Sequence, residues 1–194
     1  MKLFKLSFST IALSTMLFAA NYTIDKESSS ADFSLKYLKT KDLNGSFKNI
    51  NGSLEYDEKT TILKSLNGEI LIDFVDTSVP YVDEILKSDK IFNTPKFPNM
   101  KFVATKIEED TIFGNLTIKD VTRNIELDLI NSGIFFNKLY LQLSGKIKRS
   151  QFDLTWDELI STGSAAVSND ISIIVNIEAN LNEEMKFTRV INKK

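Results

Sequence analysis

The chain of 194 residues contains no cysteine and no histidine. These absences remove the disulfide, the thiolate nucleophile, the metal site built on cysteine or histidine, and the Ser-His-Asp triad. Acid–base catalysis would fall to Asp, Glu, Lys or Tyr with strongly shifted pKa values, which is a less common arrangement. The composition therefore disfavours an enzyme, and we expect no metal and no other cofactor.

Asp73 and Asp76 are the carboxylates that could be proposed as a glycosidase pair. Such a pair needs a fixed separation and a raised pKa on the group that acts as acid. The sequence establishes neither property, so a hydrolase built on carboxylates remains a minor alternative. It predicts two acidic side chains that face each other in a cleft.

The first twenty residues have the layout of a secretory signal peptide. Two lysines precede an apolar stretch over residues 6–18, and two alanines end it. This stretch is short for a membrane-spanning helix, which needs about 20 apolar residues. We expect residues 1–20 to be a cleaved signal peptide and residues 21–194 to form one domain without a membrane span. An uncleaved N-terminal anchor is the alternative.

Acidic and basic residues nearly balance, 26 against 24, and no run of Lys and Arg stands out. A nucleic-acid partner is therefore not expected. An exported domain of this size can bury enough apolar surface to fold without disulfides. We expect the protein in a bacterial periplasm, with release to the outside of the cell as a variant of that location.

Apolar and polar residues alternate along most of the chain after residue 30, which predicts half-buried β-strands. The strands are expected over residues 33–37, 47–56, 66–74, 100–107, 112–118, 125–129, 139–147 and 171–181. Strands with one apolar face must close or stack to hide that face from water. The expected fold class is therefore all-β, an eight-stranded antiparallel barrel with its apolar face inward.

One segment breaks this alternation. Thr77 or Ser78 could cap a short helix that Pro80 enters in its first turn. Residues 88–98, which follow the helix, contain two prolines and two phenylalanines in an irregular pattern. They predict a plug or lid over something apolar, or aromatic residues that simply seal one end of the barrel.

A barrel in the outer membrane would also have a signal peptide and alternating strands. Charges in mid-strand, such as Asp32, Glu69 and Glu178, are costly against lipid but could face a polar lumen. Polarity alone therefore does not decide between a barrel in the outer membrane and a barrel outside it. The sequence lacks aromatic girdles and a terminal aromatic residue, which favours a barrel outside the membrane.

Six short motifs occur in the order typical of the YceI-like family of exported, lipocalin-like proteins. The resemblance covers nearly all of residues 22–181, and its most specific stretch is GNLTIKDVTR at 114–123. The other motifs are residues 22–35, the Gly45-Ser46-Phe47 turn with Gly52, residues 76–93, FPNMKF at 97–102 and KRSQFD at 148–153.

The chain departs from the family pattern at several positions. Ser28 and Tyr37 stand where the family usually has histidines, and Val82-Asp83 stands where an Arg-Asp pair is common. Asp120 replaces the glycine before Val-Thr-Arg. Roles that the family gives to those histidine, arginine or glycine residues therefore cannot be carried over.

The resemblance implies a lipocalin-like barrel with one short helix and an irregular plug or lid segment. It also implies binding of a long-chain isoprenoid, such as an isoprenoid quinone or a polyprenyl phosphate, or of a similar amphiphilic lipid. Burial of a chain is worth about 0.8 kcal/mol per CH₂, and it needs no catalytic group. The alternative is a structural, stress-related or host-contact barrel with a solid interior and no lipid. A homodimer is plausible in either case.

For the lipid tail we expect a tunnel of inward-facing and plug residues, although ordinary core packing would use the same residue types. The tunnel residues are Phe33, Leu35, Phe74, Ile85, Phe92, Phe102, Leu116, Leu141, Ile173 and Val175. Phe74 and Phe102 depend most on the register, because a shift of one residue sends them outward.

For the polar mouth of the tunnel we expect Arg123, Arg149 and Asp153. A polyprenyl phosphate would use a guanidinium fork, whereas a quinone needs only hydrogen-bond donors. The alternative is a structural Arg–Asp pair that closes the turn after the seventh strand.

Overall fold

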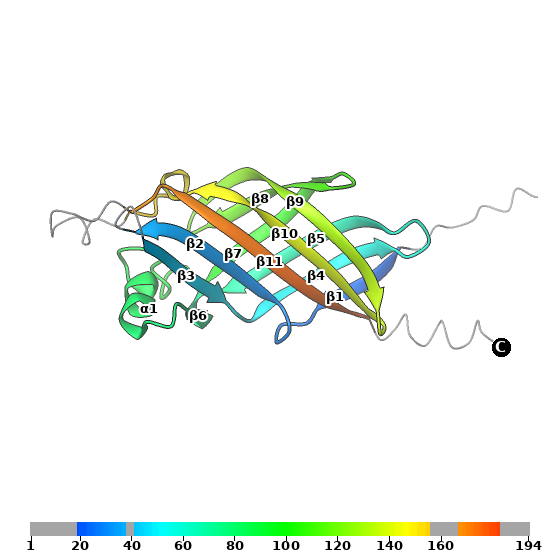
Figure 1. Cartoon of the computed structure of the whole chain (residues 1–194), viewed down its shortest axis with the longest axis horizontal. Coiled ribbons are helices and arrows are strands. Elements are labelled where there is room, and N and C mark those ends of the chain that lie inside the picture. Colours follow the sequence, from blue (N-terminus) through cyan, green and yellow to red (C-terminus); the bar gives the residue numbers. More distant parts are fainter. Residues whose placement is uncertain (1–18, 38–40, 156–166, 183–194) are drawn as a thin grey trace, which may run out of the picture.

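The computed structural model describes residues 19–37, 41–155 and 167–182, and this part of the chain is mostly β-strand (Figure 1). The strands are β1 (Ala20–Ile24), β2 (Ser30–Tyr37), β3 (Lys41–Phe47), β4 (Ile50–Asp57), β5 (Ile62–Leu71), β6 (Val75–Asp76), β7 (Asn99–Ile107), β8 (Thr111–Ile118), β9 (Val121–Phe135), β10 (Lys138–Lys148) and β11 (Asp170–Leu181). The helices are α1 (Pro80–Lys87) and the short 3₁₀ turns η1 (Ile72–Phe74) and η2 (Arg149–Phe152). The expected signal peptide lies outside the described residues up to residue 18, and Ala20 already begins β1.

The strands form one antiparallel sheet that closes on itself, because β1 pairs with both β4 and β11. Three positions in the barrel are each occupied by two consecutive strands, namely β1 with β2, β3 with β4, and β5 with β6. With β7 to β11, these give eight positions that follow one another around the barrel in chain order. The predicted eight-stranded antiparallel barrel is confirmed.

Local turns explain why three positions of the barrel each hold two strands. Asn49 separates β3 from β4 with a φ of 61°, a left-handed conformation that asparagine tolerates better than most residues. Between β1 and β2, the Asp25 carboxylate accepts hydrogen bonds from the N–H groups of Glu27 and Ser28 at 3.2 and 3.3 Å. Between β5 and β6 the chain forms η1. Each break redirects its strand, and α1 lies at the left of the barrel in Figure 1, near β6.

The start of α1 differs from the prediction. The N-cap residue is Val79, in an extended conformation and without a side-chain capping hydrogen bond, so the prediction of a Thr77 or Ser78 cap is wrong. Instead, Asp83 in the first turn accepts hydrogen bonds from the backbone N–H and the hydroxyl of Thr77, at 2.8 and 2.6 Å. The acidic side chain reaches back to the preceding loop, and it ties this loop to the helix.

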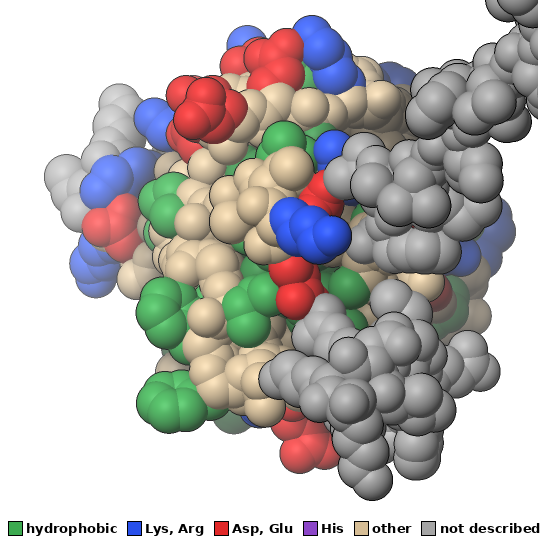
Figure 2. All heavy atoms as spheres, turned by 90° about the vertical axis from the view of Figure 1, so that its right-hand side faces the viewer, with side chains coloured by type: hydrophobic (Ala, Val, Ile, Leu, Met, Phe, Trp, Pro, Cys, Tyr) green, Lys and Arg blue, Asp and Glu red, His purple; other side chains and the backbone are tan. Residues whose placement is uncertain are grey.

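Buried side chains pack inside the barrel toward the end opposite α1. Tyr22 and Tyr56 are almost fully buried there and pack edge to face, with their ring centroids 6.3 Å apart. Ile112 and Leu139 are also fully buried near the turns at this end. Figure 2 views the molecule from this side, and its described surface mixes hydrophobic, acidic and basic side chains. We call this packed group of four residues the filled layer.

A small polar cluster on the outside of the barrel holds the β1–β2 turn. Asn180 of β11 donates a hydrogen bond to the Asp25 carboxylate at 3.1 Å, and Lys138 lies 3.7 Å from the same carboxylate. The bond from Asn180, together with the backbone N–H groups of Glu27 and Ser28 and the charge of Lys138, holds the pKa of Asp25 below its ordinary value of 3.8. These favourable contacts outweigh the partial desolvation of the carboxylate.

The lowered pKa predicts an acid-sensitive contribution to stability. A carboxyl whose pKa is lower in the folded state stabilises the fold above its unfolded pKa, and this stabilisation is lost as pH falls through the folded value. We expect Asp25→Asn to lower the free energy of unfolding by about 1 kcal/mol at pH 7 and by less at pH 3, where wild type begins to lose the contribution of the ionised carboxylate. Urea unfolding at both pH values measures this, with exposed Asp120→Asn as the control. If the loss of unfolding free energy in Asp25→Asn is the same at both pH values, the ionised Asp25 carboxylate is not the source of the stabilisation.

Candidate functional site

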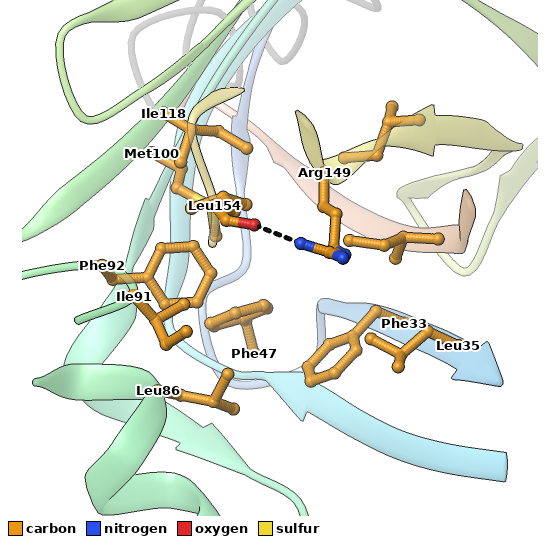
Figure 3. A pocket seen from close by; sticks show the side chains of 12 residues that line it. Phe33, Leu35, Phe47, Leu86, Ile91, Phe92, Met100, Ile118, Arg149 and Leu154 are labelled. Atoms are coloured by element: carbon orange, nitrogen blue, oxygen red, sulfur yellow. Dashed lines mark hydrogen bonds between the residues drawn. The ribbon is translucent and has the colours of Figure 1, made fainter. Parts of the chain in front are cut away.

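The half of the barrel near α1 is hollow, and its first apolar cavity has a volume of about 80 Å³ (Figure 3). We call it the outer cavity. Strands β2, β3, β7, β8, β10 and β11 provide one part of its wall, and α1 and the segment after it provide the other. The lining residues are Phe33, Leu35, Phe47, Leu86, Ile91, Phe92, Met100, Ile118, Ile147, Arg149, Leu154 and Ile171.

The segment between α1 and β7 covers this cavity, as the predicted plug requires. Ile91 and Phe92 of this segment are buried, and Phe92 packs edge to face on Phe47 with a centroid distance of 5.9 Å. Phe47 in turn contacts Phe33 at 5.4 Å. The backbone of Phe92 is fixed by a hydrogen bond from its N–H to the carbonyl oxygen of Leu86 at 3.1 Å. Three aromatic rings therefore form one connected side of the cavity.

Of the residues that the structure describes, Arg149 is the one charged residue that lines the outer cavity. Its Nε donates to the carbonyl oxygen of Ser168 at 3.1 Å, and one terminal nitrogen donates to the carbonyl oxygen of Leu154 at 2.9 Å (Figure 3). Among the described residues, no carboxylate pairs with it. These carbonyls use two of the five N–H donors of the guanidinium, and within the described part of the chain its charge has no carboxylate partner.

A second apolar cavity, of about 120 Å³, lies next to the first in the middle of the barrel. We call it the inner cavity. Its walls are apolar residues of the inner strand faces apart from Lys101 and Gly68: Ile24, Ile50, Leu66, Ile70, Met100, Phe102, Leu116, Ile118, Ile125, Leu127, Leu143, Ile147, Ile173, Val175 and Ile177. Met100, Ile118 and Ile147 line both cavities. No member of the filled layer lines either cavity, so the packed side chains lie beyond the inner one.

A larger polar groove of about 780 Å³ runs along β2 and β3 and past the loop before α1. Asp32, Asp42, Asp76 and Lys48 contribute charges to it. Phe33 lines both this groove and the outer cavity, so its ring lies between the two spaces. The ring covers Gly45, where an added Cβ would lie only 2.3 Å from the Phe33 Cζ atom.

Eight of the expected site residues line the cavities. Phe33, Leu35, Phe92 and Arg149 line the outer cavity. Phe102, Leu116, Ile173 and Val175 line the inner cavity. The structure thus brings residues from four strands, from η2 and from the plug segment around one interior space. Their contact with a ligand remains a prediction.

The other five expected residues lie elsewhere. Phe74 is half exposed because η1 interrupts the alternation of β5. Ile85 packs against the core from α1, but the neighbouring Leu86 is the one that lines the outer cavity. Leu141 is buried among the barrel side chains without lining a cavity.

The expected mouth residues Arg123 and Asp153 are also outside the cavity lining. Arg123 is exposed near the start of β9 and donates a hydrogen bond to the carbonyl oxygen of Thr122 at 2.9 Å. Asp153 is exposed and ends η2 in a left-handed conformation, with a φ of 52°. The Arg–Asp pair weighed as an alternative is not formed by Arg149, whose partners are backbone carbonyls.

The sequence reasoning missed Met100, Ile118 and Ile147, which line both cavities. A signal for them was present, because Ile118 follows Leu116 and Ile147 follows Leu143 in the same alternating phase. Met100 lies two residues after Pro98, where the predicted strand was only beginning.

The described residues offer little support for catalysis by metals or carboxylates. No group of three or more Asp or Glu residues in this part of the chain is placed to hold a metal ion. Asp76 lines the polar groove and accepts a hydrogen bond from the Ser78 N–H, whereas Asp73 does not line it. In the same part of the chain, no helix has the length and apolar character needed to cross a membrane.

Residues 22–179 match the model of the YceI-like domain. The chain belongs to the YceI-like family. The match spans β1 to β11, so it includes both cavities and the plug segment of this YceI-like barrel. The family resemblance drawn from the six motifs is confirmed.

Related YceI-like proteins have similar length and fold. A UPF0312 protein of Enterobacter sp. (strain 638) is 33% identical over 87% of this chain and 93% of its own length. The solved YceI protein of Campylobacter jejuni is 30% identical, with a TM-score of 0.65 over 76% of this chain and 90% of that one. A polyisoprenoid binding domain from Saccharophagus degradans is 14% identical, with a TM-score of 0.69 over 85% and 99% of the two chains. At that identity the last likeness shows a shared fold.

Proposed function

We propose that this YceI-like protein binds a long-chain isoprenoid, such as an isoprenoid quinone or a polyprenyl phosphate, or a similar amphiphilic lipid. The tail occupies the outer and inner cavities, and the polar head lies at Arg149. The protein acts as a carrier or scavenger rather than as an enzyme.

The observation that carries this proposal is the pair of adjoining apolar cavities with a single guanidinium at one of them. Burial of each CH₂ from water is worth about 0.8 kcal/mol, so even a partly buried tail gives micromolar binding. A guanidinium whose contacts with the described residues are carbonyl oxygens can donate further hydrogen bonds to a phosphate or a quinone oxygen. A purely structural barrel would instead have a solid interior along its whole length.

The comparisons support the same ligand class. The Saccharophagus degradans domain with the same fold is a polyisoprenoid binding domain, and a polyisoprenoid tail is the kind of apolar chain that an apolar barrel interior suits. We extend this ligand class to the present chain on the strength of its own two cavities, since sequence identity to that domain is only 14%.

We further propose that the protein acts in the periplasm after removal of residues 1–20. The support is the basic and then apolar N-terminal pattern of the sequence. Intact mass measurement of the protein recovered from a periplasmic fraction tests the proposal. A mass that retains residues 1–20 would contradict it.

The test of ligand binding uses delipidated protein and two probes that share one tail, geranylgeranyl phosphate and geranylgeraniol. We expect both to bind, and we expect Arg149→Gln to weaken the phosphate by about 10- to 100-fold relative to the alcohol, because a charge-assisted bond is lost. Any general loosening of the loop that Arg149 holds should weaken both probes equally. The ratio of their affinities therefore reports the lost bond to the phosphate. Tryptophan fluorescence or native mass spectrometry measures the affinities.

Arg123→Gln is the matched control, because Arg123 is exposed and lines neither cavity. It should leave the ratio of the two affinities unchanged. Absence of binding by either probe would contradict the proposed function. Equal effects of the two arginine variants would contradict the placement of the head at Arg149.

A further inference from the structure

We infer that Met100 is a movable partition between the outer and inner cavities, and that it determines how long a tail the barrel accepts. This inference rests on the proposed function and specifies its ligand by length. The shared lining of the two cavities carries it.

Three side chains form the boundary between the cavities. Met100, Ile118 and Ile147 come from β7, β8 and β10, and each lines both spaces. All three are buried, with 2% to 7% of their surface exposed. A chain that passes from the outer to the inner cavity must therefore move between these residues.

The three residues differ in how freely their side chains can move. The two isoleucines are branched at Cβ, which restricts their first side-chain torsion. Methionine is unbranched, has three rotatable bonds and adapts to irregular spaces in a core. Met100 can therefore change its rotamer and join the two cavities while the strands keep their hydrogen bonds.

The volumes make the partition important for tail length. The cavities measure about 80 and 120 Å³. Each is smaller than the apolar cavity of about 150 Å³ that holds one benzene ring. The outer cavity can take only part of a tail, and a longer tail gains further burial only by displacing Met100. Beyond the inner cavity the filled layer ends the available space.

The experiment measures the affinities of geraniol, farnesol and geranylgeraniol, which share a hydroxyl head and grow by one isoprene unit each. Wild type should bind more tightly with each added unit, since each buried methylene contributes about fourfold in affinity. In Met100→Phe, whose rigid ring blocks the passage, the gain from geraniol to geranylgeraniol should shrink at least tenfold. In Met100→Ala, which opens the passage, that gain should increase.

Ile72→Ala is the matched control, because it removes buried side-chain atoms from η1, and Ile72 lines neither cavity and is not part of the filled layer. It should lower stability and keep the wild-type dependence on tail length. The alanine variant at Met100 keeps the test decisive if the phenylalanine variant fails to fold.

Methyl NMR provides a readout independent of affinity. The chain has four methionines, and Met100 is the one that lies among the described residues. With methyl-labelled methionine, geranylgeraniol should shift the Met100 signal strongly and geraniol only weakly.

If prenol affinity depends on tail length in the same way in wild type and in both Met100 variants, this inference alone is overturned. Absence of any prenol binding to wild type would instead overturn the proposed function, and this inference with it.

Discussion

Replacing Leu116 by tryptophan should abolish binding of a long lipid tail while the barrel remains folded. Leu116 is half-buried and lines the inner cavity, next to Phe102 of the neighbouring strand. The indole ring would occupy a large part of the 120 Å³ that the tail needs. Because several methylenes would then lose their burial, we expect the affinity for geranylgeranyl phosphate to fall at least about a hundredfold.

The cost to stability should be modest. Insertion of extra atoms into a packed core costs about 1–3 kcal/mol, and here an empty space is available to receive them. Ile130→Trp is the control, since it adds the same ring to an exposed position of β9, where the exposed fraction is 54%. Titration and thermal unfolding of both variants provide the measurements. Unchanged lipid binding by folded Leu116→Trp protein would place the tail outside the inner cavity.

Alanine at Gly52 should destabilise the barrel severely, whereas alanine at its partner Gly68 should not. The two glycines face each other across β4 and β5. A Cβ at Gly52 would lie 2.2 Å from the carbonyl oxygen of Asn67 and 2.7 Å from Cδ1 of Ile24. The first of these is a backbone atom that cannot move without disturbing the strand pair. We expect a loss of about 3 kcal/mol or more in the free energy of unfolding.

At Gly68 an added Cβ meets no atom within 4 Å. Alanine there also restricts the unfolded chain, so we expect stability to be unchanged or to rise by about 0.5–1 kcal/mol. Urea unfolding of the two variants, which carry the same chemical change, measures the contrast. A difference of this size corresponds to roughly 6–15 °C in Tm for a domain of this length. Equal effects at the two positions would contradict the close approach at Gly52.

The alternation of apolar residues was sufficient to predict the barrel, because burial of one strand face is a local property of the sequence. It predicted the eight positions in their correct order, but not the breaks at Asn49 and η1. Because η1 was not predicted, Phe74 was wrongly expected to point inward. A 3₁₀ turn does not preserve the alternating phase of a strand.

The candidate site was less accessible to sequence reasoning. The phase of the alternation shows that a residue points into the barrel. It does not show how far along the barrel axis the residue lies. Leu141 points inward, yet it lies outside the lining of both cavities. Arg123 has the same phase as Leu127, yet its side chain is exposed near the end of the strand. Only the three-dimensional packing distinguishes the hollow half of the barrel from the filled one.

The filled layer of Tyr22, Tyr56, Ile112 and Leu139 has a consequence for exchange. Because these side chains block the interior on one side, a molecule bound in the cavities must enter and leave on the side of α1. A lipid held there loads tail first and departs head first. Any membrane or protein that receives it must therefore approach the α1 end and meet the head group before the tail is released.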